Sequence, residues 1–240
     1  DLVHGTGLRW QEACTVLGFF DDEASTAALR AALDDRDGAV RLTATRALLE
    51  KDRVFSLRQL LDQLAFPADD PPLILSEILG HLPARLHAEA TEMLRAPLPA
   101  EWLRVLAISL ARQQVLAAYE PIAELRRAAS PRVRAAAWVA LGELGDPRAG
   151  DLVGEGLRDE VADVRQAAAG CAARLGGPEV VPLLLPLLAE PDWWTGFRAA
   201  RALLALGPAG RAALEVHAAA APDAAAAQAL REEKEAFHAG

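Results

Sequence analysis

A near-copy within the chain restricts its fold more than any other feature of the sequence. The stretch VRAAAWVALGELG at 133–145 returns at 164–176 as VRQAAAGCAARLG. The arginine of this motif forms a longer series, with Ile74 where one copy is missing; its members are Arg41, Arg104, Arg134, Arg165 and Arg198. Self-similarity at a nearly fixed spacing indicates repeated units that stack to bury a shared core.

These units are predicted to consist of helices. Alanine and leucine dominate the composition and favour helices, whereas aromatic residues, which favour strands, make up only 5%. From Val133 onward an apolar stripe follows the 3.6-residue helical period. Its members are Val133, Ala136, Ala137, Ala140, Leu141 and Leu144. Turn residues separate two helical segments in each period, so we expect an all-α fold of many closely packed helices.

A second regularity is an aspartate that precedes the motif arginine at a constant distance. It occurs in the pairs Asp35 and Arg41, Asp159 and Arg165, and Asp192 and Arg198. An aspartate in a tight turn can cap the following helix and meet an arginine one turn inside that helix or in a neighbouring repeat. We predict that these pairs form a structural Asp–Arg ladder through the inter-helix turns.

These motifs resemble HEAT repeats, in particular the short bacterial HEAT-like and phycobilin-lyase-type repeats. The residues that carry the resemblance are the Asp-x5-Arg spacing, the VR-x-x-A-A motif and the LGELGDP turn at 141–147. It is strong over 131–207 and good over 24–53, and it rests on spacing alone over 54–130. The resemblance implies an α-solenoid: about seven antiparallel helix pairs stacked in a right-handed superhelix, with the VR helices on its concave face.

We expect one HEAT-like domain over 1–240, with an N-terminal cap region at 1–23 and a C-terminal capping helix at 223–240. Because the sequence begins at Asp1 without a methionine, we interpret it as a fragment of a longer chain or a mature form. The longest apolar run, 180–189, is interrupted by prolines and is too short to span a bilayer. We therefore expect no membrane insertion by this segment and a cytoplasmic protein, with room for an anchor or targeting segment upstream.

Four large apolar side chains are candidates for contacting a partner. Ile108 and Trp138 occupy the same phase of successive VR helices, on the flank of the apolar stripe. That flank is either buried between repeats or an apolar ridge on the concave face, where aromatic anchors concentrate binding energy. Trp193 and Trp194 are adjacent, and neighbouring helical residues point about 100° apart, so at least one is expected to be partly exposed.

The segment RRAASPRVR at 126–134 is a candidate anion site. It places four arginines, namely Arg126, Arg127, Arg132 and Arg134, around a predicted helix start at Ser130 and Pro131. Exposed backbone N–H groups, the positive helix end and the guanidinium groups could hold a phosphate or a carboxylate. The alternative is an ordinary solvated turn with Arg134 in the ladder.

Charge and residue spacing argue against several other functions. A net charge of −9 disfavours general nucleic-acid binding, which uses a basic surface to neutralise phosphates. The five histidines form no i, i+4 pair and none precedes a glutamate, so we predict no metal site and no cofactor. Cys14 and Cys171 lie far apart in apolar helical pattern and are expected to be buried free thiols.

The sequence therefore favours a non-catalytic module for protein–protein interaction or scaffolding, which binds a protein or peptide segment on its concave face. This role is the one that the resemblance implies for most HEAT-type proteins. Two alternatives remain from the same resemblance: a bilin-lyase-like protein, and a DNA-binding protein of the alkylpurine-glycosylase type. The oligomeric state is left open.

Overall fold

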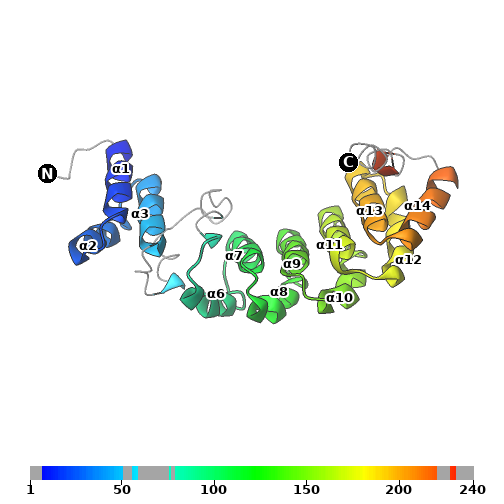
Figure 1. Cartoon of the computed structure of the whole chain (residues 1–240), viewed down its shortest axis with the longest axis horizontal. Helices are drawn as coiled ribbons and strands as arrows, with labels where there is room; N and C mark the ends of the chain where they lie inside the picture. Colours follow the sequence, from blue (N-terminus) through cyan, green and yellow to red (C-terminus); the bar gives the residue numbers. More distant parts are fainter. Residues whose placement is uncertain (1–6, 51–55, 59–75, 77–78, 221–227, 231–240) are drawn as a thin grey trace. The chain divides into compact units, whose positions relative to one another are not determined.

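The computed structural model describes residues 7–50, 56–58, 76, 79–220 and 228–230 (Figure 1). Every regular element in these ranges is a helix, and the all-α repeat fold predicted from the sequence is confirmed. The chain divides into two compact units between Gln113 and Gln114. None of the helices within the described ranges combines the length and the apolar character that crossing a membrane requires.

The first unit contains a three-helix cluster and, further along the chain, a helix pair. Its helices are α1 (Gly7–Gly18), α2 (Glu23–Ala32), α3 (Gly38–Glu50), the short η1 (Ala84–Leu86), α6 (His87–Met93) and α7 (Ala100–Arg112). Helices α1, α2 and α3 pack against one another, and α6 packs against α7. Helix α2 begins where Asp22 accepts hydrogen bonds from the backbone N–H of Ser25 at 2.8 Å and from its hydroxyl at 2.7 Å, because a carboxylate satisfies the free donors of a first helical turn.

Glu89 on α6 connects two distant parts of this unit. Its carboxylate accepts hydrogen bonds from the Ser56 hydroxyl at 2.7 Å and from the backbone N–H groups of Leu57 at 2.9 Å and Arg58 at 3.0 Å. Burial would raise the pKa of Glu89, but these hydrogen bonds outweigh it and hold the pKa below its ordinary value. The carboxylate thus replaces the local cap that the segment at 56–58 would otherwise need.

Replacing Glu89 by alanine is expected to expose the backbone at 56–58 to solvent exchange. The backbone N–H groups of Leu57 and Arg58 lose charge-assisted hydrogen bonds, each contributing about 1.5 kcal/mol, so their amide hydrogens should exchange roughly tenfold faster. Hydrogen exchange followed by mass spectrometry measures this effect. The control is Glu92→Ala on the same helix, where the side chain is mostly exposed; equal exchange rates in the two variants would contradict the prediction.

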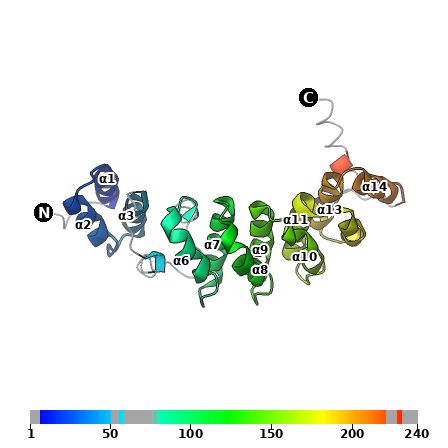
Figure 2. The same cartoon turned by 60° about the horizontal axis from the view of Figure 1, so that its bottom comes forward.

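The second unit is a stack of helix pairs, in each of which a shorter helix comes before a longer one. The pairs are α8 (Tyr119–Leu125) with α9 (Pro131–Leu144), α10 (Arg148–Gly156) with α11 (Ala162–Leu175), and α12 (Val181–Leu184) and η4 (Leu185–Ala189) with α13 (Trp193–Ala205). The short helices η2 (Leu116–Ala118) and η3 (Pro178–Val180) lead into α8 and α12, and α14 (Pro208–Ala220) packs on α13. Helices α9, α11 and α13 lie side by side, and the shorter helices form a second row (Figures 1 and 2).

The period of the second unit is visible at both ends of its longer helices. The residues that precede α9, α11 and α13 are Ser130, Val161 and Asp192, which follow one another in two equal steps along the chain. After α9 and α13 the chain turns through Gly145 and Gly207 at φ of 75° and 77°, a left-handed conformation that glycine adopts without steric cost. Equal spacing of the starts gives these three helices a common register.

The core of this unit follows the predicted stripe. All six stripe residues of α9, from Val133 to Leu144, are buried. Small side chains let the helices approach closely: a β-carbon on Gly150 of α10 would lie 2.4 Å from the backbone oxygen of Leu175 at the end of α11. Alanine and glycine therefore set the distance between helices here, as the alanine excess predicts.

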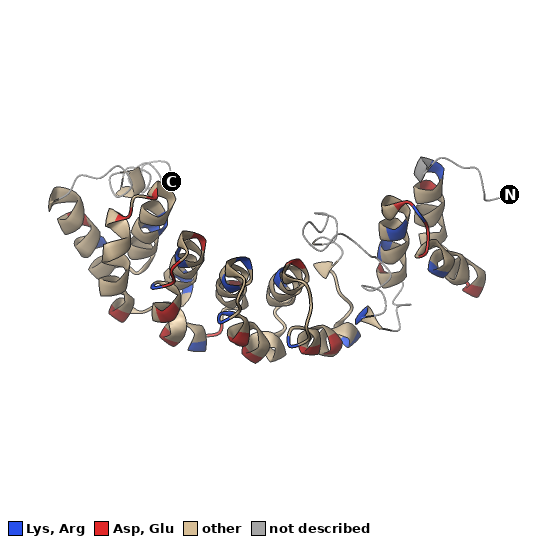
Figure 3. Ribbon diagram, turned by 180° about the vertical axis from the view of Figure 1, so that it is seen from behind, with Lys and Arg blue, Asp and Glu red and all other residues tan. Residues whose placement is uncertain are grey.

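Acidic residues lie on the shorter helices α8 and α10 of the second unit (Figure 3). They are Glu120 and Glu124 on α8 and Asp151 and Glu155 on α10. Glu120 pairs with Arg148, and Glu155 pairs with Arg126 and Arg127, so arginines of the same row compensate much of this negative charge.

The predicted domain limits fall largely outside the described residues. Residues 1–6 of the expected cap region at 1–23 lie outside them, and the remainder contains α1. Of the capping helix expected at 223–240, residues 228–230 are described, and they are helical. One domain over 1–240 stays a prediction.

Candidate functional site

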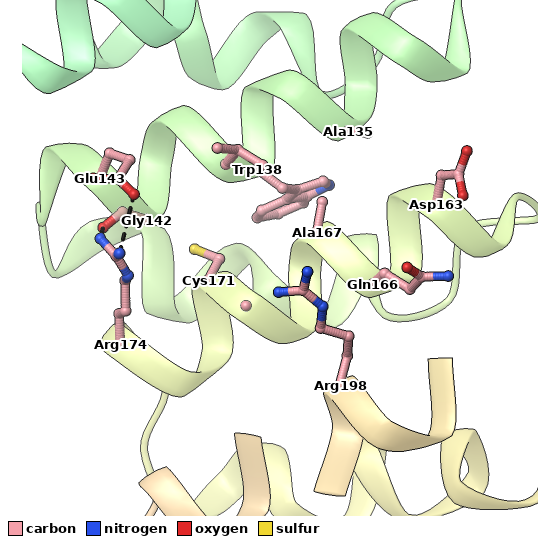
Figure 4. A pocket seen from close by; sticks show the side chains of 12 residues that line it. Ala135, Trp138, Gly142, Glu143, Asp163, Gln166, Ala167, Cys171, Arg174 and Arg198 are labelled. Atoms are coloured by element: carbon pink, nitrogen blue, oxygen red, sulfur yellow. Dashed lines mark hydrogen bonds and ion pairs between the residues drawn. The ribbon is translucent and has the colours of Figure 1, made fainter. Parts of the chain in front are cut away.

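A pocket of about 390 Å³ opens on the face formed by α9, α11 and α13 (Figure 4). Its floor is α11, where Ala167 and Gly170 present almost no side chain. A β-carbon on Gly170 would meet no atom within 4 Å, so the space above it is open. Pockets that hold ligands combine such apolar walls with a few polar groups.

The α9 wall of the pocket is apolar. The Trp138 indole lines it but is only 1% exposed, whereas Val139 beside it is 39% exposed. Trp138 is held between repeats: a β-carbon on Gly156 of α10 would lie 2.4 Å from its Cε2 atom and 2.6 Å from the β-carbon of Ala168 on α11. This burial agrees with the inter-repeat alternative for Trp138, and Val139 presents the accessible apolar surface.

Charged groups stand around the rim, and their pairing differs. At one end Arg174 pairs with Glu143, with Nη2 and Oε1 3.0 Å apart. Arg198 extends from α13 toward α11, and Asp163 lies at the other end of the pocket (Figure 4). In the described part of the chain, neither the Arg198 nor the Asp163 side chain forms a hydrogen bond or an ion pair with another residue. Arg198 therefore offers a free guanidinium to a ligand.

Gln166 connects the pocket to the start of α13. Its amide Nε2 donates to Asp192 at 2.9 Å and to the Thr195 hydroxyl at 3.2 Å. Asp192 caps α13 by accepting from the Thr195 hydroxyl at 2.6 Å and the Thr195 N–H at 2.8 Å, and these bonds hold the pKa of Asp192 below its ordinary value. The rim between α11 and α13 is thus fixed by hydrogen bonds.

The predicted aromatic pair lies on the first turn of α13. Trp193 is 39% and Trp194 57% exposed, which confirms the expected partial exposure. Trp193 stacks on Phe197 at a centroid distance of 4.9 Å and meets Trp194 edge-to-face at 4.8 Å. A role of either tryptophan in partner binding stays a prediction, as it does for Ile108, which is half-buried on α7 in the first unit.

The ladder has a geometry that the spacing alone does not show. Arg41 and Arg165 donate to the backbone oxygens of Asp35 and Asp159, at 2.9 Å and 2.7 Å, and not to their carboxylates. Arg134 instead forms a bidentate pair with the Asp159 carboxylate of the next repeat, at 2.8 Å and 2.9 Å, and Arg165 pairs in the same way with Glu190. Arg134 and Arg165 thus each join their own turn to the turn of the following repeat.

The predicted pair of Asp192 and Arg198 does not form within the described residues. In the common register of the helix starts, the position of Arg134 and Arg165 is taken by Gly196. Arg198 lies two positions further on, which turns its side chain by about 200° around the helix axis. It therefore lies in the pocket, while Asp192 serves as the cap of α13.

The arginines of the proposed anion site are engaged by carboxylates of the chain. Arg126 and Arg127 reach Glu155 at 2.9 Å and 3.3 Å, and Arg134 is held by Asp159. Arg132 at the start of α9 is exposed and also has an interaction partner. Ser130 precedes α9 without a side-chain capping bond, and Pro131 is the first helical residue. This arrangement supports the alternative of a structural turn.

The two cysteines are buried free thiols, as predicted. Cys171 lies beneath the pocket, and burial raises its pKa to about 12. Burial also raises the pKa of Cys14, and Asp35 adds to this effect. Since the thiolate is the reactive form, both thiols are poor nucleophiles near neutral pH.

Sequence reasoning misses Val139, Gly170 and the position of Arg198 in the pocket. Val139 and Gly170 do not belong to the apolar stripes, and the spacing from Asp192 places Arg198 in the ladder. A helical projection of α9, α11 and α13 in their common register puts these three residues on the exposed side. The common register is therefore the sequence signal that could have identified them.

Stacked helix pairs with one regular period define an α-solenoid, a class built from repeats that contact their neighbours. The model of HEAT repeats matches residues 88–170 and 151–232. The chain therefore belongs to the HEAT-repeat family, as the sequence motifs predict. A search of curated proteins gives no match to this chain.

Proposed function

We propose that this chain is a protein-interaction module that holds a segment of a partner protein on the face of α9, α11 and α13. HEAT repeats generally mediate protein–protein interaction or scaffolding. The observation that supports binding on this particular face is the pocket. It combines the exposed Val139, the open space above Gly170 and the free guanidinium of Arg198.

The shape of this face suits an extended or helical segment better than a small, enclosed ligand. The floor is a helix of small residues, and the two neighbouring long helices, α9 and α13, form the walls. An apolar side chain of the partner can enter above Gly170, where it displaces water from apolar surface. In the described residues no observation favours the bilin-lyase or the DNA-binding alternative over this role.

Crosslinking from the pocket tests this proposal. A photo-reactive amino acid at position 139 is expected to capture one partner protein in native extract, and the same group at the exposed Asp151 on α10 serves as the control. Gly170→Leu fills the open space and should lower the crosslinking yield about tenfold, which corresponds to a loss of about 1.4 kcal/mol of binding free energy. Its melting temperature should not fall, because position 170 faces open space.

The proposal fails if positions 139 and 151 capture the same proteins with equal yield. It also fails if Gly170→Leu, folded as the wild type by circular dichroism, leaves the yield from position 139 unaltered.

A further inference from the structure

We infer that the segment held by this face is acidic: it places a carboxylate on Arg198 and a bulky apolar side chain above Gly170. This inference rests on the proposed function and names the chemistry of the partner. It starts from the difference between Arg198 and the other motif arginines of the second unit. Arg134 and Arg165 are each saturated by a carboxylate of the following repeat, whereas Arg198 has no partner in the described residues.

A second arginine extends the free positive charge along α13. Arg201 is exposed, and within the described ranges its side chain also forms no hydrogen bond or ion pair. Trp194, Arg198 and Arg201 follow at i, i+4 and i+7, so they form one exposed stripe on the helix. Guanidinium groups bind carboxylates with paired hydrogen bonds, and they stay charged at every physiological pH.

Around the pocket the arginines without a partner outnumber the carboxylates without one in the described residues. Of the two carboxylates on its rim, Glu143 is already neutralised by Arg174. Asp163 lies at the far end of the pocket, where it can accept a backbone N–H of the bound segment (Figure 4). An acidic segment is therefore attracted to the face of α9, α11 and α13 by the guanidinium groups of Arg198 and Arg201.

The apolar part of the ligand is inferred from the open space next to Arg198. Ala167 and Gly170 leave open space beside it, and Val139 faces this space from α9. A leucine or an aromatic side chain fits there, close to the carboxylate along the bound segment. The recognised pattern is thus an Asp or Glu near one large apolar residue.

Selection from a degenerate library of short peptides tests this inference directly. The immobilised full chain is expected to enrich peptides with Asp or Glu near Leu, Phe or Trp. In Arg198→Gln the acidic preference should disappear while the apolar preference remains, and the dissociation constant of the best selected peptide should rise about tenfold. Arg158→Gln, in the turn after α10, replaces an exposed arginine away from the pocket; it is the matched control and should behave as wild type.

The outcomes separate this inference from the proposed function. Enrichment of apolar residues without Asp or Glu, or an acidic preference that survives Arg198→Gln, overturns the acidic segment and leaves the interaction module standing. If no peptide is retained while position 139 still crosslinks a partner, the linear acidic segment is again overturned and the partner binds through a folded surface. Failure of both experiments overturns both proposals.

Discussion

Replacing Trp138 by alanine is expected to lower the free energy of unfolding by about 3–5 kcal/mol, the range typical of removing a buried tryptophan. The indole is 1% exposed and fills the space between α9, α10 and α11, so its loss leaves a cavity between two repeats. Urea unfolding followed by circular dichroism measures the change. Trp194→Ala on α13 is the control; its side chain is 57% exposed and meets Trp193 edge-to-face, so the effect should be only about 1 kcal/mol.

A double-mutant cycle with Gly156 shows whether the contact itself is responsible. Gly156→Ala brings a β-carbon to 2.4 Å from the Trp138 ring and should destabilise the wild type by about 1–3 kcal/mol. In the Trp138→Ala background only the contact with the β-carbon of Ala168 at 2.6 Å remains, so the part of this penalty that the indole causes should vanish. Equal penalties in both backgrounds, or a Trp138→Ala variant as stable as wild type, would show that Trp138 is not part of the inter-repeat core.

Replacing Asp159 by alanine is expected to lower the free energy of unfolding by about 2–4 kcal/mol. The carboxylate holds Arg134 of the preceding repeat in a bidentate pair and accepts the N–H of Val161 at 2.9 Å, and both charged side chains are largely buried, at 14% and 12% exposed. The variant leaves the guanidinium without its main partner. Glu160→Ala, which removes a mostly exposed carboxylate 3.6 Å from the same arginine, should change stability by no more than about 0.5 kcal/mol.

The Asp159 contribution also has a defined pH dependence. The hydrogen bond from Arg134 holds the pKa of Asp159 below its ordinary value. A lowered pKa in the folded chain means that the unfolded chain binds the proton first, so the stabilisation is present above the ordinary pKa of about 3.9 and is lost as the pH falls through the lower folded pKa. The difference in unfolding free energy between wild type and Asp159→Asn should therefore be constant near neutral pH and shrink in acid. A difference that grows in acid would contradict this assignment.

Most of the fold follows from the sequence because the period and the helical stripes are local properties. Pro131, Pro147 and Pro178 are turn signals in the sequence, and they lie at or beside the starts of α9, α10 and η3. The buried stripe of α9 is predicted residue by residue. Such features depend on residues within one or two helical turns of each other. These residues are close in the sequence, so the sequence alone shows the pattern.

The candidate site is harder to predict because its residues are defined by other helices. Trp138 and Val139 are adjacent, and the larger one is buried because Gly156 on another helix has no side chain in its way. The spacing of the motif arginines predicts that Arg198 belongs to their series. The sequence distance from Arg165 to Arg198, however, is two residues longer than the distance between the starts of α11 and α13. That difference separates a structural arginine from one available to a ligand, and it becomes evident once the start of α13 is known.

The arginine ladder has a consequence for how this protein responds to mechanical or thermal stress. Since Arg134 and Arg165 are each attached to their own turn and to the next one, opening one repeat breaks a charged pair in its neighbour. Coupling of this kind strengthens the interaction free energy between adjacent repeats, which makes the repeats unfold together. The ladder reaches the turn before α13 through Glu190, but on α13 itself the arginine position is taken by Gly196 and the linkage ends, so fraying should begin at α14 and halt at α13. The helix that carries the free arginine is thus the last one that the ladder holds in place.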